Sequence, residues 1–364
     1  MVKKLVILLL LSYSQQLMSQ DYNWWVNGQV FDSFILPHNK KVSHLIKGRP
    51  SGFELNIQKE LNGTRAWEKL YNHPIVNYGL AYYDLKNESQ LGELYIASTS
   101  VDLPLIKSKH TNLFFRIGAG LVYSTQPYNR ETNNQNTMIG SRFTCLIQTR
   151  LTYEIKLNEQ VKLTPALNIT HGSNGAQSVP NSGINIITAN IGISYRLLKR
   201  NEDAGGTPPP LPKKPASLFN FYLLLSSGKN TMTAQVRTPL IFFNIAAIGQ
   251  KYLSPKSDLQ FGIEYFHNKA LEKQIATSWF NKDLTSFPDF KRAGILIGHE
   301  LKAGGLGFIT QLGVYIYNPS KSNMPVYQRY GITNEFTDHI IGQISLKAHT
   351  FTAEQIEFGL GWKF

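Results

Sequence analysis

The sequence predicts an all-β protein, a transmembrane antiparallel β-barrel, on three observations. The chain of 364 residues is 12% aromatic but only 17% charged, and short alternating segments closed by polar turns recur along it. Its first residues have the pattern of a secretory signal peptide. Its last segment alternates strictly between apolar side chains and small or charged ones. We therefore expect an exported chain that crosses a membrane with strands.

Residues 1–19 fit a signal peptide. Two lysines precede an apolar run, Leu5 to Leu11, and a polar stretch then ends at Ser19. This run is far shorter than the roughly 20 residues that a membrane-spanning helix needs, and no later stretch comes closer. Cys145 is the only cysteine, so no internal disulfide can stabilise the exported chain. A closed barrel provides stability through its backbone hydrogen bonds instead.

The C-terminal segment 356–364 is the most specific indication of the class. Its apolar side chains share one face of a strand, namely Ile356, Phe358, Leu360, Trp362 and Phe364. The residues between them share the other face, namely Glu357, Gly359, Gly361 and Lys363. A last strand of this kind with a terminal Phe resembles the terminal strand of bacterial outer-membrane barrels.

Sixteen segments alternate in the manner of strands. They are 28–36, 52–61, 76–85, 91–106, 112–124, 140–157, 161–172, 183–199, 217–228, 237–252, 257–268, 290–303, 306–318, 326–335, 338–349 and 353–364. Because single-chain bacterial barrels have an even number of strands, we expect about sixteen, or fourteen if the two weakest segments, 28–36 and 326–335, are not strands.

A linker divides these segments into two sets of eight. Residues 200–215 are rich in proline and charge and predict a periplasmic connection. One large barrel, with 20–199 and 216–364 as its halves, and two tandem eight-stranded barrels both fit this division. We expect the single barrel, because nothing in the second half indicates a function of its own. From the fifth segment on, alternating connection lengths place the loop 173–182 outside the cell.

The net charge of +13 is compatible with phosphorylated lipid headgroups as partners, while export argues against nucleic acid. Basic residues that line a wet lumen and rim explain the charge equally well. In the segment 140–157, Arg142, Gln148, Arg150 and Glu154 share one face, and we expect them to fill the lumen with salt bridges.

A candidate site lies where the seventh segment ends. Along 161–173 the odd positions are apolar and the even ones polar, so the odd face is the expected lipid face. His171 and Ser173 continue that face, and in 183–199 the odd apolar face extrapolates back to Asn185. An isolated H-x-S at a strand end is usually an interfacial or loop feature. Here, however, three polar residues converge on one outward face, and polar groups there need a reason.

The stretch H-G-S-N followed by P-N-S-G-I resembles the lipid A deacylases of the PagL type, the acyloxyacyl hydrolase family. Members are outer-membrane barrels with a Ser-His-Glu triad on the lipid-facing wall. The resemblance implies that His171 is the base and Ser173 the nucleophile. It also implies that Asn174 supports the oxyanion. Independently of the resemblance, we expect the loop that begins at Asn174 and Gly175 to offer backbone N–H groups to the oxyanion.

The sequence departs from that family at Asn185, where the family has Glu. Outer-membrane phospholipases A are also similar, because they use a Ser-His-Asn triad with the Asn twelve residues after the Ser, the spacing of Ser173 and Asn185. Asn can fix the imidazole tautomer, but it lacks the charge that would stabilise an imidazolium. The phospholipases need calcium, and the loop Ala176 to Ser182 has no carboxylate to bind it.

We therefore expect an esterase that removes an ester-linked acyl chain from lipid A in the outer membrane, without a cofactor or metal. The other histidines show no zinc-type spacing. Phospholipid as substrate, a barrel or channel without catalysis, and a homodimer all stay open. The acyl position cut and the role of residues 216–364 are not specified by the sequence.

Overall fold

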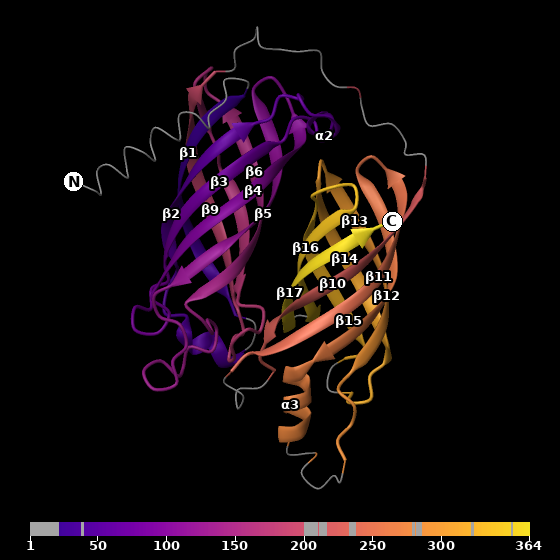
Figure 1. The fold of residues 1–364 in the computed structure, drawn as a ribbon. Helices are drawn as coiled ribbons and strands as arrows, with labels where there is room; N and C mark the ends of the chain where they lie inside the picture. The colour runs from indigo at the N-terminus through magenta and orange to yellow at the C-terminus, as the bar shows by residue number, and fades with distance from the viewer. Residues whose placement is uncertain are drawn as a thin grey trace, which may run out of the picture. The chain divides into compact units, whose positions relative to one another are not determined.

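The computed structural model of the chain is built almost entirely of β-strands (Figure 1). It describes residues 22–37, 40–199, 210, 217–232, 238–278, 281, 286–321, 324–350 and 352–364. Three short helices complete the secondary structure of these ranges, namely η1 (Lys40–Leu45), α2 (Ala66–Leu70) and α3 (Lys269–Thr277). None of the described helices has the length and hydrophobicity that a membrane-spanning helix requires.

The first sheet is antiparallel and closes on itself. Its strands are β1 (Asn23–Leu36), β2 (Ser51–Glu60), β3 (Ile75–Asp84), β4 (Glu93–Lys107), β5 (Thr111–Ser124), β6 (Phe143–Lys156), β7 (Val161–Leu163), β8 (Ala166–Ser173) and β9 (Ile184–Leu198). Strands β1 to β6 are neighbours in chain order, and β7 and β8 both lie between β6 and β9. Strand β9 also pairs with β1, from Trp24 opposite Leu198 to Leu36 opposite Asn185. This last pairing gives a ring of eight strand positions.

The second sheet is a closed barrel of its own. Its strands are β10 (Phe219–Asn230), β11 (Leu240–Ser254), β12 (Ser257–Asn268), β13 (Arg292–Ala303), β14 (Leu306–Tyr317), β15 (Val326–Glu335), β16 (Ile340–His349) and β17 (Thr352–Lys363). Neighbours follow the chain order, and β17 pairs back onto β10, with Tyr222 opposite Lys363 and Ser227 opposite Phe358.

The prediction of an all-β, antiparallel barrel protein is confirmed, but the expected single large barrel is wrong. The two closing pairings are β1 with β9 and β10 with β17. In each sheet they give the backbone N–H and C=O groups of the first and last strands hydrogen-bond partners within the same sheet. Alternation specifies strands and their faces. It does not specify which distant strand completes the ring, because that choice depends on long-range hydrogen bonding.

The predicted strand segments match the observed strands closely. Both of the weakest segments, 28–36 and 326–335, belong to strands, namely β1 and β15. The seventh segment is divided by Pro165 into β7 and β8, so seventeen strands are labelled instead of sixteen. Proline lacks the N–H that a ladder needs, and this explains the interruption.

By compactness the chain forms two units, which we describe separately. The first holds the described residues up to Gln126, together with Cys145–Gly172 and Ile184–Leu211. The second holds Pro127–Thr144, Ser173–Gly183 and Pro212–Phe364. The expected signal peptide and, apart from one residue, the expected linker 200–215 lie outside the described residues.

The interior of the first barrel is filled by charged and amide side chains. The buried guanidinium of Arg116 donates to Asp102 at 2.5 Å and to Glu54 at 3.4 Å, and the buried Arg150 also pairs with Glu54. Lys162 and Glu154, which are also buried, pair at 3.0 Å. Buried charges of this kind require partners, and the ring of strands brings them together from distant parts of the sequence.

The predicted lumen face of β6 is confirmed for three of its four residues. Gln148, Arg150 and Glu154 are buried, but Arg142 is exposed. The strand begins at Phe143, so Arg142 precedes it and the alternation does not apply. The segment 140–157 therefore began too early in our prediction.

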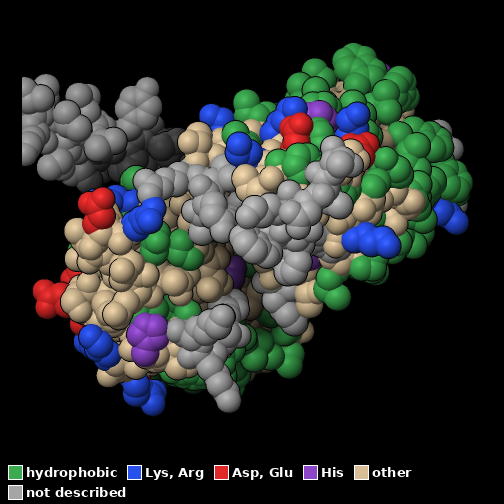
Figure 2. Space-filling model, turned by 90° about the horizontal axis from the view of Figure 1, so that it is seen from below, with side chains coloured by type: hydrophobic (Ala, Val, Ile, Leu, Met, Phe, Trp, Pro, Cys, Tyr) green, Lys and Arg blue, Asp and Glu red, His purple; other side chains and the backbone are tan. Residues whose placement is uncertain are grey.

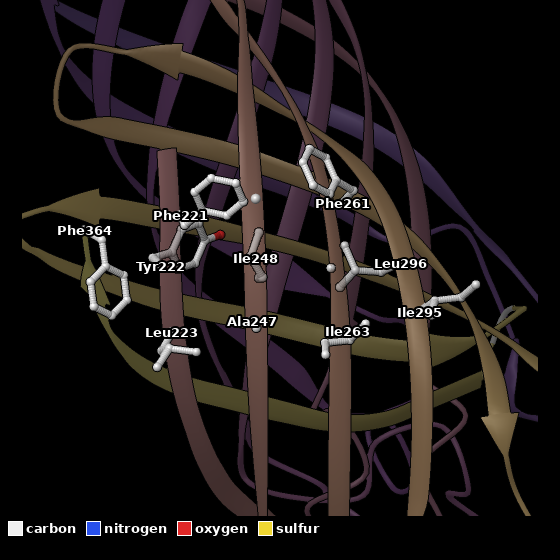
Figure 3. A pocket seen from close by; sticks show the side chains of 12 residues that line it. Phe221, Tyr222, Leu223, Ala247, Ile248, Phe261, Ile263, Ile295, Leu296 and Phe364 are labelled. Carbon is white, nitrogen blue, oxygen red and sulfur yellow. The ribbon is translucent and has the colours of Figure 1, made fainter. Parts of the chain in front are cut away.

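The second barrel has the same division into a polar interior and an apolar wall. Arg329 bridges Glu264 and Glu357 at 2.7 Å each inside it. Figure 2 shows hydrophobic side chains over broad areas of the visible surface. Hydrophobic side chains on the outer wall of this barrel line a hollow of about 450 Å³ (Figure 3). Phe221, Phe261 and Ile263 are among them, and the small residues Ala247, Gly249 and Gly262 also line it.

We predict that Glu54→Ala destabilises the first barrel by about 3–5 kcal/mol, because it leaves two buried guanidinium groups without their shared carboxylate. Urea unfolding in phospholipid vesicles, followed by tryptophan fluorescence, measures this change. Asp32→Ala is the matched control, because Asp32 also pairs with an arginine, Arg49, but both side chains are largely exposed. Equal, small effects of the two variants would contradict the prediction.

Candidate functional site

The strand β8 directs two of the predicted site residues outward. Its alternation is regular, with Leu167 and Ile169 more than half exposed and the intervening Asn168 and Thr170 buried. His171 and Ser173 follow on the exposed face, and both are half-buried. The odd face predicted from the sequence is thus the outer wall of the barrel.

His171 and Asn185 form a direct contact between the neighbouring strands β8 and β9 of the first barrel. They are register partners in the pairing of β8 with β9, and His171 Nδ1 lies 2.6 Å from Asn185 Oδ1. A carbonyl oxygen only accepts hydrogen bonds, so Nδ1 carries the proton and donates it. In the neutral imidazole this leaves Nε2 as the basic nitrogen.

Ser173 is the last residue of β8, and two donors converge on its hydroxyl oxygen. The backbone N–H of Gly175 donates to Ser173 Oγ at 3.2 Å, and the side-chain amide of Asn181 donates at 2.9 Å. The side-chain oxygen of Asn181, Oδ1, accepts a hydrogen bond from the backbone N–H of Gly140 at 3.2 Å, and this bond fixes the orientation of the side-chain amide. Both N–H groups thus lie beside the Ser173 hydroxyl, and N–H groups close to an attacking serine are the kind of donor that can turn to the oxyanion formed in acyl transfer.

Asn181 was missed by the sequence reasoning, although it lies in the quoted stretch P-N-S-G-I. The resemblance suggested Asn174 for oxyanion support, but the side-chain amide of Asn174 donates hydrogen bonds to other loop residues. It donates to Ser141 Oγ at 3.1 Å and to the Ser178 carbonyl at 2.9 Å. The loop residue Asn181 has no periodic pattern to mark its direction, and only the folded loop shows where its side chain points.

The loop that follows Ser173 is held by a second loop, Pro127–Thr144. The N–H groups of Ser182 and Gly183 donate to the carbonyls of Thr137 and Met138 at 2.9 Å each. Gly175 and Ala176 both have positive φ angles, of 60° and 62°. Such a turn suits glycine, whereas alanine there needs support from its surroundings.

No group of three or more His, Cys, Asp or Glu side chains in the described ranges could hold a metal ion. The single cysteine, Cys145, is exposed on β6. The candidate site consists of a histidine with its amide partner, a serine at the end of the same strand, and two N–H donors.

Two family models match the chain. One, described as lipid A 3-O-deacylase (PagL), matches residues 51–194, and the other, described as acyloxyacyl hydrolase, C-terminal domain, matches residues 219–364. The chain belongs to the acyloxyacyl hydrolase family. Its family is that of the outer-membrane lipid A 3-O-deacylases, and the three predicted site residues lie within the first matched region.

Several solved outer-membrane barrels are similar to parts of the chain. Neisserial surface protein A matches with a TM-score of 0.31 and 9% identity over 49% of this chain and 98% of its own. The outer membrane enzyme PagL matches with a TM-score of 0.29 and 11% identity over 47% and 98%. The attachment invasion locus protein Ail of Yersinia pestis gives 0.29 and 12% over 50% and 100%. Such low TM-scores add nothing to the family assignment. No curated protein matches the chain.

Proposed function

We propose that this acyloxyacyl hydrolase cleaves an ester-linked acyl chain of lipid A with Ser173 as nucleophile, His171 as general base and Asn185 as the group that orients the imidazole. The observation that supports this most directly is the 2.6 Å contact between His171 Nδ1 and Asn185 Oδ1, because it leaves Nε2 basic. Ser173 follows at i+2, and side chains at that spacing point to the same side of a strand.

The reaction proceeds by acyl transfer through the serine. Ser173 Oγ attacks the ester carbonyl while its proton passes to His171 Nε2. The negative charge that forms on the carbonyl oxygen is stabilised by N–H donors, for which Gly175 and Asn181 are the candidates. Collapse breaks the ester bond, and the alcohol portion of lipid A leaves with the proton from His171. Water then attacks the acyl-serine with the same base, which releases the fatty acid and restores Ser173.

The outward position of the site suits a substrate that never leaves the membrane. Apolar side chains such as Leu167 and Ile169 lie on the same face below His171, where acyl chains of the bilayer contact the barrel. An ester in the outer leaflet reaches Ser173 by lateral diffusion. The buried polar interior of the barrel is not needed as a route.

We predict that Ser173→Ala abolishes deacylation, because it removes the attacking oxygen. Mass spectrometry of lipid A from cells that make the wild type should show loss of one acyl chain, and the variant should restore the intact species. Identical spectra for the two would overturn the proposed function. Fatty-acid release from phospholipid, with lipid A untouched, would assign the chain to phospholipase chemistry instead.

Asn185→Glu should retain or increase the deacylation rate. A carboxylate in place of the amide still accepts the His171 Nδ1 proton and adds a charge that stabilises the imidazolium. Initial rates on lipid A in detergent micelles measure the effect, with Asn185→Leu as the variant that can accept no hydrogen bond and should lose most activity. If the glutamate variant is as inactive as the leucine variant, Asn185 does not have this role.

Asn181→Ala should lower kcat by about 10²–10³, because it removes one of two donors to the reacting centre. The KM for lipid A should change little, since the donor acts on charge that develops during the reaction. Steady-state kinetics separate the two parameters. Asn168→Ala serves as a control of the same residue type, because Asn168 faces the interior from the same strand as Ser173. A KM effect alone would contradict the oxyanion role.

A further inference from the structure

The outer face of β17 has one buried member. Phe358, Leu360 and Trp362 are 55%, 61% and 52% exposed on this face, as the wall of a membrane barrel requires. Ile356 belongs to the same alternation but is only 7% exposed. A part of the chain therefore covers the end of this strand in place of lipid.

The segment that covers Ile356 is the loop Ser173–Gly183, which belongs to the same compact unit as the second barrel. A Cβ atom built on Gly175 would lie 2.3 Å from Ile356 Cγ1 and 3.4 Å from Leu346 Cδ1. The Gly175 backbone is thus packed directly on the barrel wall. Glycine is required there for space and also for its φ of 60°.

Two hydrogen bonds fix the next residues of the loop to the same barrel. Thr231, which follows β10, donates its backbone N–H to the Ala176 carbonyl at 2.7 Å. Its hydroxyl donates to the Gln177 carbonyl at 3.0 Å. Thr231 is 3% exposed, so water competes little for these bonds. They supply the support that Ala176 needs in its strained conformation.

The anchored residues adjoin the donor at the proposed nucleophile. Gly175 donates its N–H to Ser173 Oγ, and the three residues Gly175, Ala176 and Gln177 are held by Ile356 and Thr231. A donor that must meet a developing oxyanion has to be held in place before the reaction, and a displacement of about 1 Å can cost 10² in rate.

We propose that the C-terminal barrel is a positioning element of the esterase site, which acts through Thr231 and Ile356 on the backbone that aims the Gly175 N–H. This inference rests on the function proposed above and gives the second barrel a role in it. Thr231 and Ile356 are positioning residues, because they contact the loop and not the reacting atoms.

The test compares wild type with Thr231→Val and Ile356→Ala in the purified full chain. Each variant should lower kcat on lipid A by about tenfold and leave KM within about twofold, because the loop is loosened while the lipid-facing wall is kept. Labelling of Ser173 by a fluorophosphonate probe should slow in parallel, and this readout does not depend on lipid A. Thr231→Ser keeps both hydrogen bonds and should retain the wild-type rate.

Matched controls separate positioning from general damage to the barrel. Ile263→Ala removes the same atoms from a wall position that is 62% exposed, and Thr310→Val makes the same change at an exposed position of β14. Both should react as wild type does. Circular dichroism of all variants should show the same β-content, since none of the substitutions touches the interior.

The outcomes distinguish the two proposals. If wild type neither deacylates lipid A nor reacts with the probe, the proposed function fails and the inference fails with it. If wild type is active and Thr231→Val and Ile356→Ala match it in both assays, the function stands and the positioning role is overturned. Equal losses in the control variants would also overturn it, because the effect would then not belong to the loop contacts.

Discussion

Closure of the backbone hydrogen-bond ladders governs how this chain can cross a membrane and where its side chains point. In a bilayer no water is available for an unpaired N–H or C=O group, so a sheet can cross only when its first and last strands pair. The pairing of β9 with β1 and that of β17 with β10 achieve this twice along the chain. Each ring then fixes which face of every strand is outward.

The closed rings also explain the unusual distribution of charge. The side chains between outward apolar residues point into a narrow interior, where charges such as those of Glu54 and Arg116 must pair with each other. A barrel of eight strand positions is just wide enough for side chains to fill it. The interiors are therefore occupied by ion pairs, and the chemistry of the proposed site takes place on the outer wall.

The site combines a rigid part with a part that needs support. His171 and Asn185 face each other on neighbouring strands, where the ladder sets their distance. The donors to Ser173 come from a loop, whose conformation depends on hydrogen bonds to Pro127–Thr144 and on contacts with the second barrel. Strand geometry thus places the proposed base, whereas loop packing places the proposed oxyanion donors.

The fold class, the positions of nearly all strands, and the outward direction of His171, Ser173 and Asn185 could be predicted from the sequence. All of these follow from period-two alternation, which is a local property. It also led to an error at Arg142, because alternation does not mark where a strand begins. The proposed roles of His171 and Ser173 come from the family resemblance of the stretches H-G-S-N and P-N-S-G-I.

The number of barrels, the direction of the Asn181 amide and the burial of Ile356 follow from the tertiary structure alone. Each depends on contacts between residues far apart in the chain, such as Tyr222 with Lys363 or Gly175 with Ile356. Long-range pairing is selected by the free energy of the whole ring, and loop side chains have no periodicity that predicts their direction. The alternation of β17 therefore gives no sign of the role that we propose for the second barrel, because in the sequence Ile356 resembles any other wall residue.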